Sequence, residues 1–235
     1  VVANDTFRFD IDASDLTAEY LAGDQDDVAT GDLPSSDVTG STMTIAAPTL
    51  TVTGSTQPGD QTVVKNASDV EVAAFNLKAN GVSDLEVTSI KVHLNSSGTG
   101  DENDVKNVEL YLEEGGVWTP VSSGSKDISA STLSATFSTG FTIEHDSSVR
   151  LLVVADVPST ATAGHIFSLG FESESTDFTV NDEKGSTSNV SVSLVEANGT
   201  ADTANGLDAA GDVEVTVAST ANGLDAAGDV EVTVA

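Results

Sequence analysis

Short runs in which apolar and polar residues alternate fill the middle of this chain and constrain its fold more than any other feature. Examples are "VELYL" at Val108–Leu112, "TLSATF" at Thr132–Phe137 and "VSVSL" at Val190–Leu194, and turn-forming residues separate such runs. A period of two residues is typical of a β-strand with one buried face, and Val, Ile and Thr favour that conformation. About nine such runs lie between Ser41 and Glu196, which predicts an all-β domain built as a two-sheet sandwich.

Two of these runs change phase part-way along. In "DVEVAAFNLKA", Val72 and Phe75 belong to one apolar face only if one extra residue separates them. In "LEVTSIKVHL", the same shift lies between Val87 and Ile90. One extra residue in a strand is the mark of a β-bulge, so we predict a bulge in each strand.

Three stretches carry a resemblance to a known family. They are "APTLTVTGSTQPGDQTVVKNASDVEVAAFNLKANGVSDLEVTSIKVHL", "DVKNVELYLEEGG" and "VRLLVVADVPSTATAGHIFSLGF". Together they resemble the immunoglobulin-like modules of surface-layer and extracellular filament proteins of archaea and uncultivated bacteria. The resemblance covers about Pro48–Leu194 and concerns a framework of strands, with no active-site motif. It implies an immunoglobulin-like two-sheet sandwich and an extracellular structural or adhesive role.

Strand-forming extensions flank the predicted domain on both sides. We assign residues 1–40 to an acidic N-terminal arm, residues 41–196 to the immunoglobulin-like sandwich and residues 197–235 to a tail. In the arm, "TFRFDID" alternates like a strand, and "SDLTAEYLAG" has the cap residues and the glycine stop of a short helix. A loosely attached arm is the alternative.

The tail contains one segment twice, letter for letter: "TANGLDAAGDVEVTVA" occupies Thr203–Ala218 and returns at Thr220–Ala235. Each copy holds an alternating "VEVTV", and we expect its valines to form a subunit-interface strand: Val213, Val215, Val217, Val230, Val232 and Val234. If one copy completes an edge of its own domain, the other copy needs a second edge, which a neighbouring subunit can supply. Repeated head to tail, strand addition does not close and gives a filament. The alternatives are a further strand in the same chain, a flexible anchor or a tandem copy without a partner.

Charge narrows the range of partners. The chain has 38 Asp and Glu residues against 8 Lys and Arg, a formal net charge of −30. Such a surface repels phosphate, which argues against nucleic acid and against an anionic membrane as partners. It also repels other copies of the chain, so assembly needs salt, bound cations or strong contacts. No cysteine is present, which excludes disulfides and thiolate metal sites, and no apolar run is long enough to span a bilayer.

Acidic loops are the best candidates for metal binding, because Ca²⁺ prefers hard oxygen ligands. Our preferred site is the loop "GDENDVKN", which offers Asp101, Glu102, Asn103 and Asp104. The segments "AGDQDDVATGD" and "DFTVNDEKG" are similar in composition, and none of the three has EF-hand spacing. Solvated loop charge is the alternative interpretation. Calcium is the one cofactor that the sequence supports.

No catalytic motif stands out, and we expect no enzyme. The chain lacks a Gly-x-Ser-x-Gly elbow, a P-loop and a dinucleotide-binding glycine pattern. His93, His145 and His165 lack the short spacings of a zinc site, so we expect structural or surface roles, with His93 on the polar face of its strand. Trp118, Tyr111 and Tyr20 are candidates for a sugar-stacking platform, with packing within the sandwich as the alternative.

The leading hypothesis is an extracellular or cell-surface structural subunit of a filament or pilus-like fibre, assembled by donor-strand complementation. The tail, or alternatively the N-terminal arm, would insert into the next copy, so the partner is the chain itself, with other surface proteins or glycans as further candidates. We expect no nucleic acid partner and no direct membrane insertion. The start "VVANDTFRFD" lacks the regions of a signal peptide, and we expect a mature exported chain. On such a chain the N-x-S/T sequons would be glycan acceptors, at Asn4, Asn66, Asn95, Asn189 and Asn198. The alternative function is an adhesive or carbohydrate-binding module of a larger cell-surface or S-layer protein.

Overall fold

A computed structural model describes residues 5–16, 33, 35–95, 99–122, 124–188, 190–195 and 215–218. By its contacts the chain divides into two units, Val1–Ala47 and Pro48–Ala235. Within the ranges described, no helix is long and apolar enough to cross a bilayer.

The N-terminal unit contains a two-stranded ribbon in which the chain runs out and returns. β1 (Thr6–Phe7) pairs with β4 (Met43–Thr44), and β2 (Asp10–Ile11) pairs with β3 (Val38–Thr39). Of the short helix expected in this arm, the structure shows a 3-10 turn at Ala13–Asp15, capped by the side chain of Asp12. The rest of that expectation falls on residues 17–23, which lie outside the described residues.

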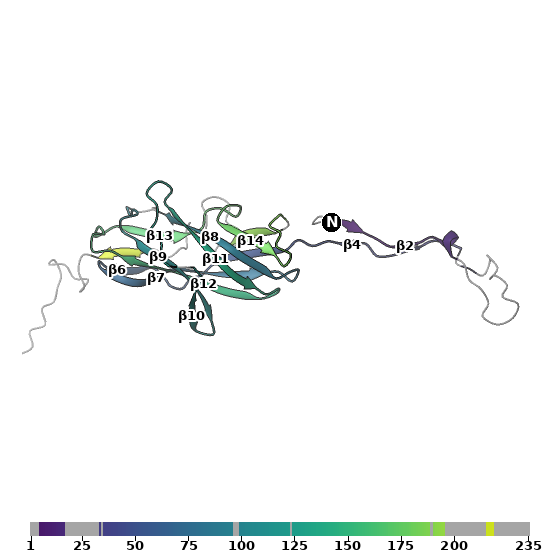
Figure 1. The fold of residues 1–235 in the computed structure, drawn as a ribbon, viewed down its shortest axis with the longest axis horizontal. Coiled ribbons are helices and arrows are strands. Elements are labelled where there is room, and N and C mark those ends of the chain that lie inside the picture. Colours follow the sequence, from purple (N-terminus) through teal and green to yellow (C-terminus); the bar gives the residue numbers. More distant parts are fainter. Residues whose placement is uncertain are drawn as a thin grey trace, which may run out of the picture. The chain divides into compact units, whose positions relative to one another are not determined.

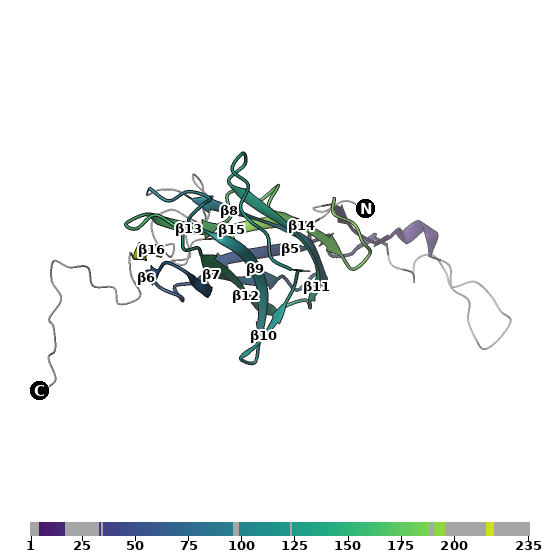
Figure 2. The same cartoon turned by 60° about the vertical axis from the view of Figure 1, so that its left-hand side comes forward.

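The larger unit is a sandwich of two mixed β-sheets, as the alternating pattern predicts (Figures 1 and 2). The first sheet has the order β10-β9-β12-β7-β5-β15. Its strands are β5 (Thr49–Gly54), β7 (Ala67–Ala79), β9 (Lys106–Glu114), β10 (Val117–Pro120), β12 (Ser148–Val157) and β15 (Ser191–Val195).

The second sheet has the order β11-β8-β13-β16-β6, and β14 also pairs with β8. Its strands are β6 (Gln61–Val64), β8 (Leu85–Asn95), β11 (Ser134–Ile143), β13 (Ile166–Gly170), β14 (Phe178–Asp182) and β16 (Val215–Ala218). The last strand of each sheet lies parallel to an early one, β15 beside β5 and β16 beside β6. The first two strands of the sandwich, β5 and β6, therefore each pair with one of its last two strands.

The core lies between the two sheets and is built from alternate residues of each strand. Its largest fully buried side chains are Phe137, Phe167, Phe171, Leu50, Leu77, Leu85, Ile90, Leu110, Ile143, Leu151, Leu169 and Leu194. Both predicted bulges are present. The pairing of β12 with β7 passes from Ala73 to Glu71, which leaves Val72 as the extra residue, and the pairing of β14 with β8 passes from Ser89 to Val87. The extra residues return Phe75 and Ile90 to the core face, where both are buried.

Candidate functional site: the slot that holds β16

The strand β16, which belongs to the first copy of the duplicated segment, lies inside the second sheet with a neighbour on each side. Thr216 pairs with Thr62 of β6 in parallel and with Ile166 of β13 in antiparallel register. The Val217 amide donates to the His165 carbonyl at 2.9 Å, and the Gly164 amide donates to the Val217 carbonyl at 2.8 Å. We call this position, between β6 and β13, the strand slot. Without β16 both neighbouring strands would expose unpaired backbone groups.

Apolar contacts hold β16 in the slot as well as backbone hydrogen bonds. Val215 is 0% exposed and Val217 is 1% exposed, and both belong to the sandwich core. Full burial of a valine contributes about 1.5–3 kcal/mol, so the two side chains contribute roughly 3–6 kcal/mol. A typical domain has a net stability of only about 5–15 kcal/mol. The slot is therefore a site whose occupation decides much of the stability of the sandwich.

Residues 196–214, which connect β15 to β16, lie outside the described residues. The same holds for Val213, Val230, Val232 and Val234 of the predicted interface strand. The structure thus places Val215 and Val217 within the sandwich of this chain. Of the two copies of the duplicated segment, it describes only residues 215–218.

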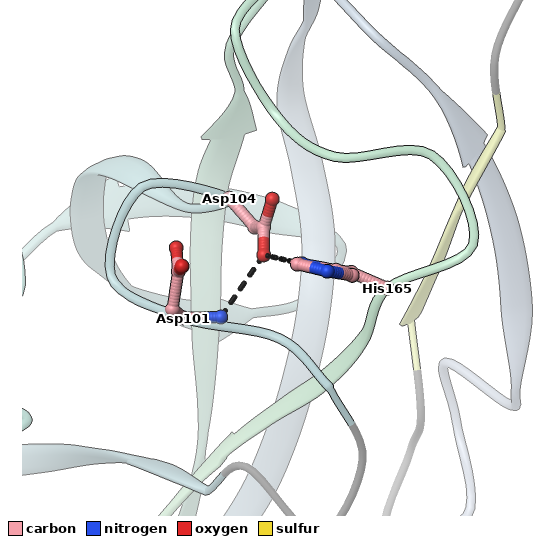
Figure 3. Close-up of side chains that lie close together, drawn as sticks. All are labelled: Asp101, Asp104 and His165. Carbon is pink, nitrogen blue, oxygen red and sulfur yellow. Dashed lines mark hydrogen bonds and ion pairs between the residues drawn. The ribbon is translucent and has the colours of Figure 1, made fainter.

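A buried carboxylate fixes the loop that forms one rim of the slot. Asp104 accepts hydrogen bonds from the Asp101 amide at 2.9 Å and from His165 Nδ1 at 2.7 Å (Figure 3). It also accepts one from the Thr162 amide at 2.7 Å. Burial alone raises the pKa of Asp104, but the bonds from the Thr162 and Asp101 amides and from His165 outweigh it, so the pKa lies below its ordinary value. His165 uses its backbone carbonyl for Val217 and its ring for Asp104. The Asp104 carboxylate therefore positions the backbone to which β16 binds.

The loop predicted to bind calcium is this same loop, next to the strand slot. Ligand atoms of Asp101, Asp104 and His165 lie within 4.8 Å of one another. The other two predicted ligands take local roles: the Asn103 amide donates to Asp101 Oδ1 at 2.8 Å, and Asn103 Nδ2 donates to Glu102 Oε1 at 3.3 Å. A cation bound here would have Asp101 and Asp104 as oxygen ligands, but Asp104 already accepts three hydrogen bonds. The arrangement as it stands works as a structural clamp, and calcium binding remains a prediction.

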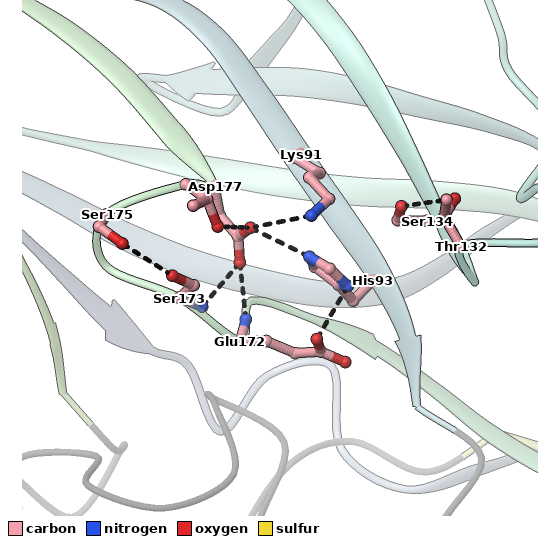
Figure 4. A network of polar contacts seen from close by, with 9 residues as sticks. Lys91, His93, Thr132, Ser134, Glu172, Ser173, Ser175 and Asp177 are labelled. Atoms are coloured by element: carbon pink, nitrogen blue, oxygen red, sulfur yellow. Dashed lines mark hydrogen bonds and ion pairs between the residues drawn. The ribbon is translucent and has the colours of Figure 1, made fainter.

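A second buried polar network lies where β13 ends and β14 begins. Asp177 is 1% exposed, and its carboxylate accepts from His93 Nε2 at 3.0 Å and from the amides of Glu172 at 2.7 Å and Ser173 at 2.8 Å (Figure 4). Burial alone raises the pKa of Asp177, but these hydrogen bonds lower it by more, so the pKa lies below its usual range. His93 Nδ1 lies 3.1 Å from Glu172 Oε2, so both ring nitrogens of His93 face carboxylates. Neither nitrogen is therefore placed to accept a proton from a nucleophilic side chain. The network fastens the segment between β13 and β14 to β8.

The sequence predicted the strand face that His93 occupies, but not its partners. His93 does point away from the sandwich core, as its position beside buried Val92 and Leu94 requires, yet it is itself buried because the segment 172–177 covers it. The segment "DFTVNDEKG" is not the expected acidic loop throughout, because Phe178–Asp182 forms β14. His145 has a surface partner, Asp84, whose Oδ1 lies 2.8 Å from His145 Nδ1.

Other predicted residues lie away from the slot. Trp118 and Tyr111 share one hollow on the first sheet, whereas Tyr20 is outside the described residues. Of the sequons, Asn66 lies in the turn between β6 and β7 with φ of 64°, and Asn95 is the last residue of β8. Asn4, Asn189 and Asn198 are outside the described residues.

No protein-family model matches this chain, and none of the curated proteins matches it.

Proposed function

We propose that this protein is a structural subunit of an extracellular filament or pilus-like fibre, assembled by β-strand addition between copies. The observation that carries the proposal is the strand slot between β6 and β13. It is filled by a segment that the sequence contains twice, and the residues that the structure describes form one such slot.

The two copies have the same sequence and therefore the same intrinsic affinity for the slot. Val232 and Val234 correspond to Val215 and Val217, the two valines that the slot buries, and Thr233 corresponds to outward-facing Thr216. The described residues form one slot for the two copies, so one copy per chain is left without it. That copy can enter the slot of another chain by displacing the first copy of that chain, or its own slot by displacing its twin, and in either place it gains the same apolar burial and backbone hydrogen bonds. A chain of such exchanges, each from one subunit to the next, does not close and grows as a filament.

The remaining features are consistent with this function. The immunoglobulin-like character implied by the sequence resemblance fits a repeated structural module. A net charge of −30 opposes contact between copies, so growth requires salt or divalent cations such as calcium. Such a chain would work at the cell surface or outside the cell, without nucleic acid, membrane insertion or catalysis.

The N-terminal ribbon offers the alternative inserting segment. Its large apolar side chains are exposed, with Phe9 at 75%, Ile11 at 52% and Val38 at 53%. Clustered exposed apolar residues mark a contact surface, because water contact with them is unfavourable. The ribbon could therefore dock on another copy even if the tail does not.

The direct test is to change the second copy alone. Val232→Asp would place a charge where the slot buries a valine, and Thr233→Asp is the matched control, since the equivalent Thr216 faces outward. We expect filaments from the control and folded monomers from Val232→Asp, in electron micrographs and light scattering at high salt. Equal assembly of the two variants would contradict donation by the tail. Loss of assembly on deletion of residues 1–47 in the same assay would point to the ribbon.

A second candidate function, an adhesive or carbohydrate-binding module of a larger surface protein, is favoured by one observation. Trp118 and Tyr111 lie together beside carboxylates on an open sheet face.

A further inference from the structure

The outer face of the first sheet, away from the core, carries a hollow of about 240 Å³. Its lining residues come from β7, β9, β10 and β12: Asp69, Glu71, Tyr111, Trp118, Leu152 and Val154. The β9–β10 hairpin, which provides both aromatic rings, projects from the sandwich in both views (Figures 1 and 2). Small-molecule sites have this kind of lining, a mostly apolar surface with a few polar groups, although a volume of 240 Å³ suits only a single ring.

Strand register explains why these side chains meet. Tyr111 pairs with Leu152, and Leu152 pairs with Ala74, so the three form one row across the sheet. In the next row Val154 lies between Glu109 and Glu71. The bulge at Val72 keeps Glu71 on this outer face, because without the extra residue it would turn toward the core. Apolar residues therefore form the floor, and carboxylates form the rim.

The rim offers hydrogen-bond acceptors. In the part of the chain that the structure describes, no hydrogen bond or ion pair involves the carboxylate of Asp69 or Glu71. The third carboxylate, that of Glu109 beside Val154, accepts a hydrogen bond from the Tyr111 hydroxyl. Carboxylates accept but do not donate, so a ligand seated here has to supply N–H or O–H donors.

Trp118 is held in place by a fixed cation. The Arg150 guanidinium lies 5.8 Å from the centre of the indole ring. It donates to Glu113 at 2.6 Å and to the Gln57 carbonyl at 2.7 Å. Each contact restricts the rotation of Arg150, and through it that of the Trp118 ring. The aromatic wall of the hollow is thereby pre-organised.

We infer that this hollow binds one ring of a neutral sugar. A pyranose ring has an apolar C–H face for Trp118 and Tyr111 and hydroxyl donors for Asp69 and Glu71. The three carboxylates repel an anion, and the Arg150 guanidinium already lies beside the Trp118 ring in the position that a cationic ligand would take, so we assign a neutral ligand. This inference deepens the second candidate function and stands whether or not the tail joins subunits.

The chain contains one tryptophan, Trp118, so intrinsic fluorescence reports on this hollow directly. The probes are cellohexaose, xylohexaose and mannohexaose, with tetramethylammonium chloride and sodium glucuronate as charged probes. We expect at least one neutral oligosaccharide to change the emission saturably, with a dissociation constant between about 10 μM and 10 mM. The two charged probes should leave it unchanged. Silence toward all three oligosaccharides, or a saturable response to a charged probe instead, would overturn the inference.

Variants tie the response to the hollow. Glu71→Gln removes one rim charge from an exposed side chain, and we expect about threefold to tenfold weaker binding. Trp118→Ala, measured by calorimetry, should weaken binding at least about tenfold. Val117→Ser is the matched control, because Val117 neighbours Trp118 but is 64% exposed and lines no part of the hollow. Unchanged affinity in Glu71→Gln and Trp118→Ala would place the sugar elsewhere, and this outcome is independent of filament formation.

Discussion

Replacement of Asp177 by Asn measures how much the buried network around Asp177 and His93 contributes to the free energy of unfolding. The Asn side chain keeps one oxygen as acceptor for the amides of Glu172 and Ser173, at 2.7 and 2.8 Å, but these two hydrogen bonds lose the charge of the acceptor. Its NH₂ group can only donate, so the 3.0 Å contact with His93 has to reverse its direction, and Thr176 Oγ1 and Lys91 lose their partner. A hydrogen bond to a charged group contributes about 1 kcal/mol more than a neutral one, so Asp177→Asn should cost roughly 3 kcal/mol.

Urea unfolding provides the assay. With a denaturant dependence of about 2 kcal/mol per molar urea, the midpoint should fall by about 1.5 M at pH 7. Glu144→Gln is the control, since it removes the same charge from an exposed side chain and should change stability by less than about 0.5 kcal/mol. A cost below about 1 kcal/mol for Asp177→Asn would refute the assignment of the network as a fastener of the segment 172–177.

The pH dependence gives a second check with a definite sign. Because the folded pKa of Asp177 lies below its unfolded value, its contribution is fully present above about pH 4. It is lost as the pH falls through the folded pKa. The difference in stability between wild type and Asp177→Asn should therefore shrink below pH 4 and stay constant between pH 5 and pH 7.

The remaining predictions concern the clamp, the hollow and one close backbone approach. Asp104→Asn should cost about 2–4 kcal/mol in urea unfolding, since it removes a buried carboxylate that three donors share, and added Ca²⁺ should not restore the loss. The hydrogen bond from Tyr111 to Glu109, together with burial, raises the pKa of Tyr111 to about 12, and Glu109→Gln should bring it back toward 10 in an ultraviolet titration on a Tyr20→Phe background. Gly100→Ala should destabilise the sandwich by about 1–3 kcal/mol in thermal unfolding, because a Cβ would lie 2.5 Å from the Ile166 carbonyl oxygen; an unchanged melting temperature would contradict this.

Periodicity in the sequence predicted the sandwich and even its irregularities. The phase shifts at Val72 and Thr88 are local, because each is visible as one extra residue between apolar positions on a single strand. The strands β6, β10 and β14 were not predicted, since each has only four or five residues and little alternation. β10 had a usable signal, the "GG" at Gly115 and Gly116, whose positive φ angles of 60° and 80° form the hairpin turn before it.

The sites were harder to predict because they join distant residues. Asp101 and Asp104 lie close in sequence, but their partner His165 comes from the loop before β13, and nothing in its own segment indicates this. Burial of His93 depends in the same way on a segment that folds back over β8. Tyr111 and Trp118 were predicted together, whereas Asp69 and Glu71 join them only through the pairing of β7 with β12. Local patterns thus predict which face a side chain takes, and the pairing of strands decides its neighbours.

The most direct measurement of strand exchange is a cysteine cross-link between Thr62 and the second copy. Thr62 pairs with Thr216 in the strand slot, and the equivalent residue of the second copy is Thr233. Neighbouring residues on paired strands lie within disulfide range, and the native chain has no cysteine to interfere. In the Thr62→Cys, Thr233→Cys variant, mild oxidation should give a ladder of covalent multimers on non-reducing gels. The control is Thr62→Cys with Thr216→Cys, in which we expect links within one chain as well, because these two residues pair in the same chain. If Thr62→Cys with Thr233→Cys gives only monomers, whether linked within the chain or not linked at all, donation of the tail between subunits is contradicted.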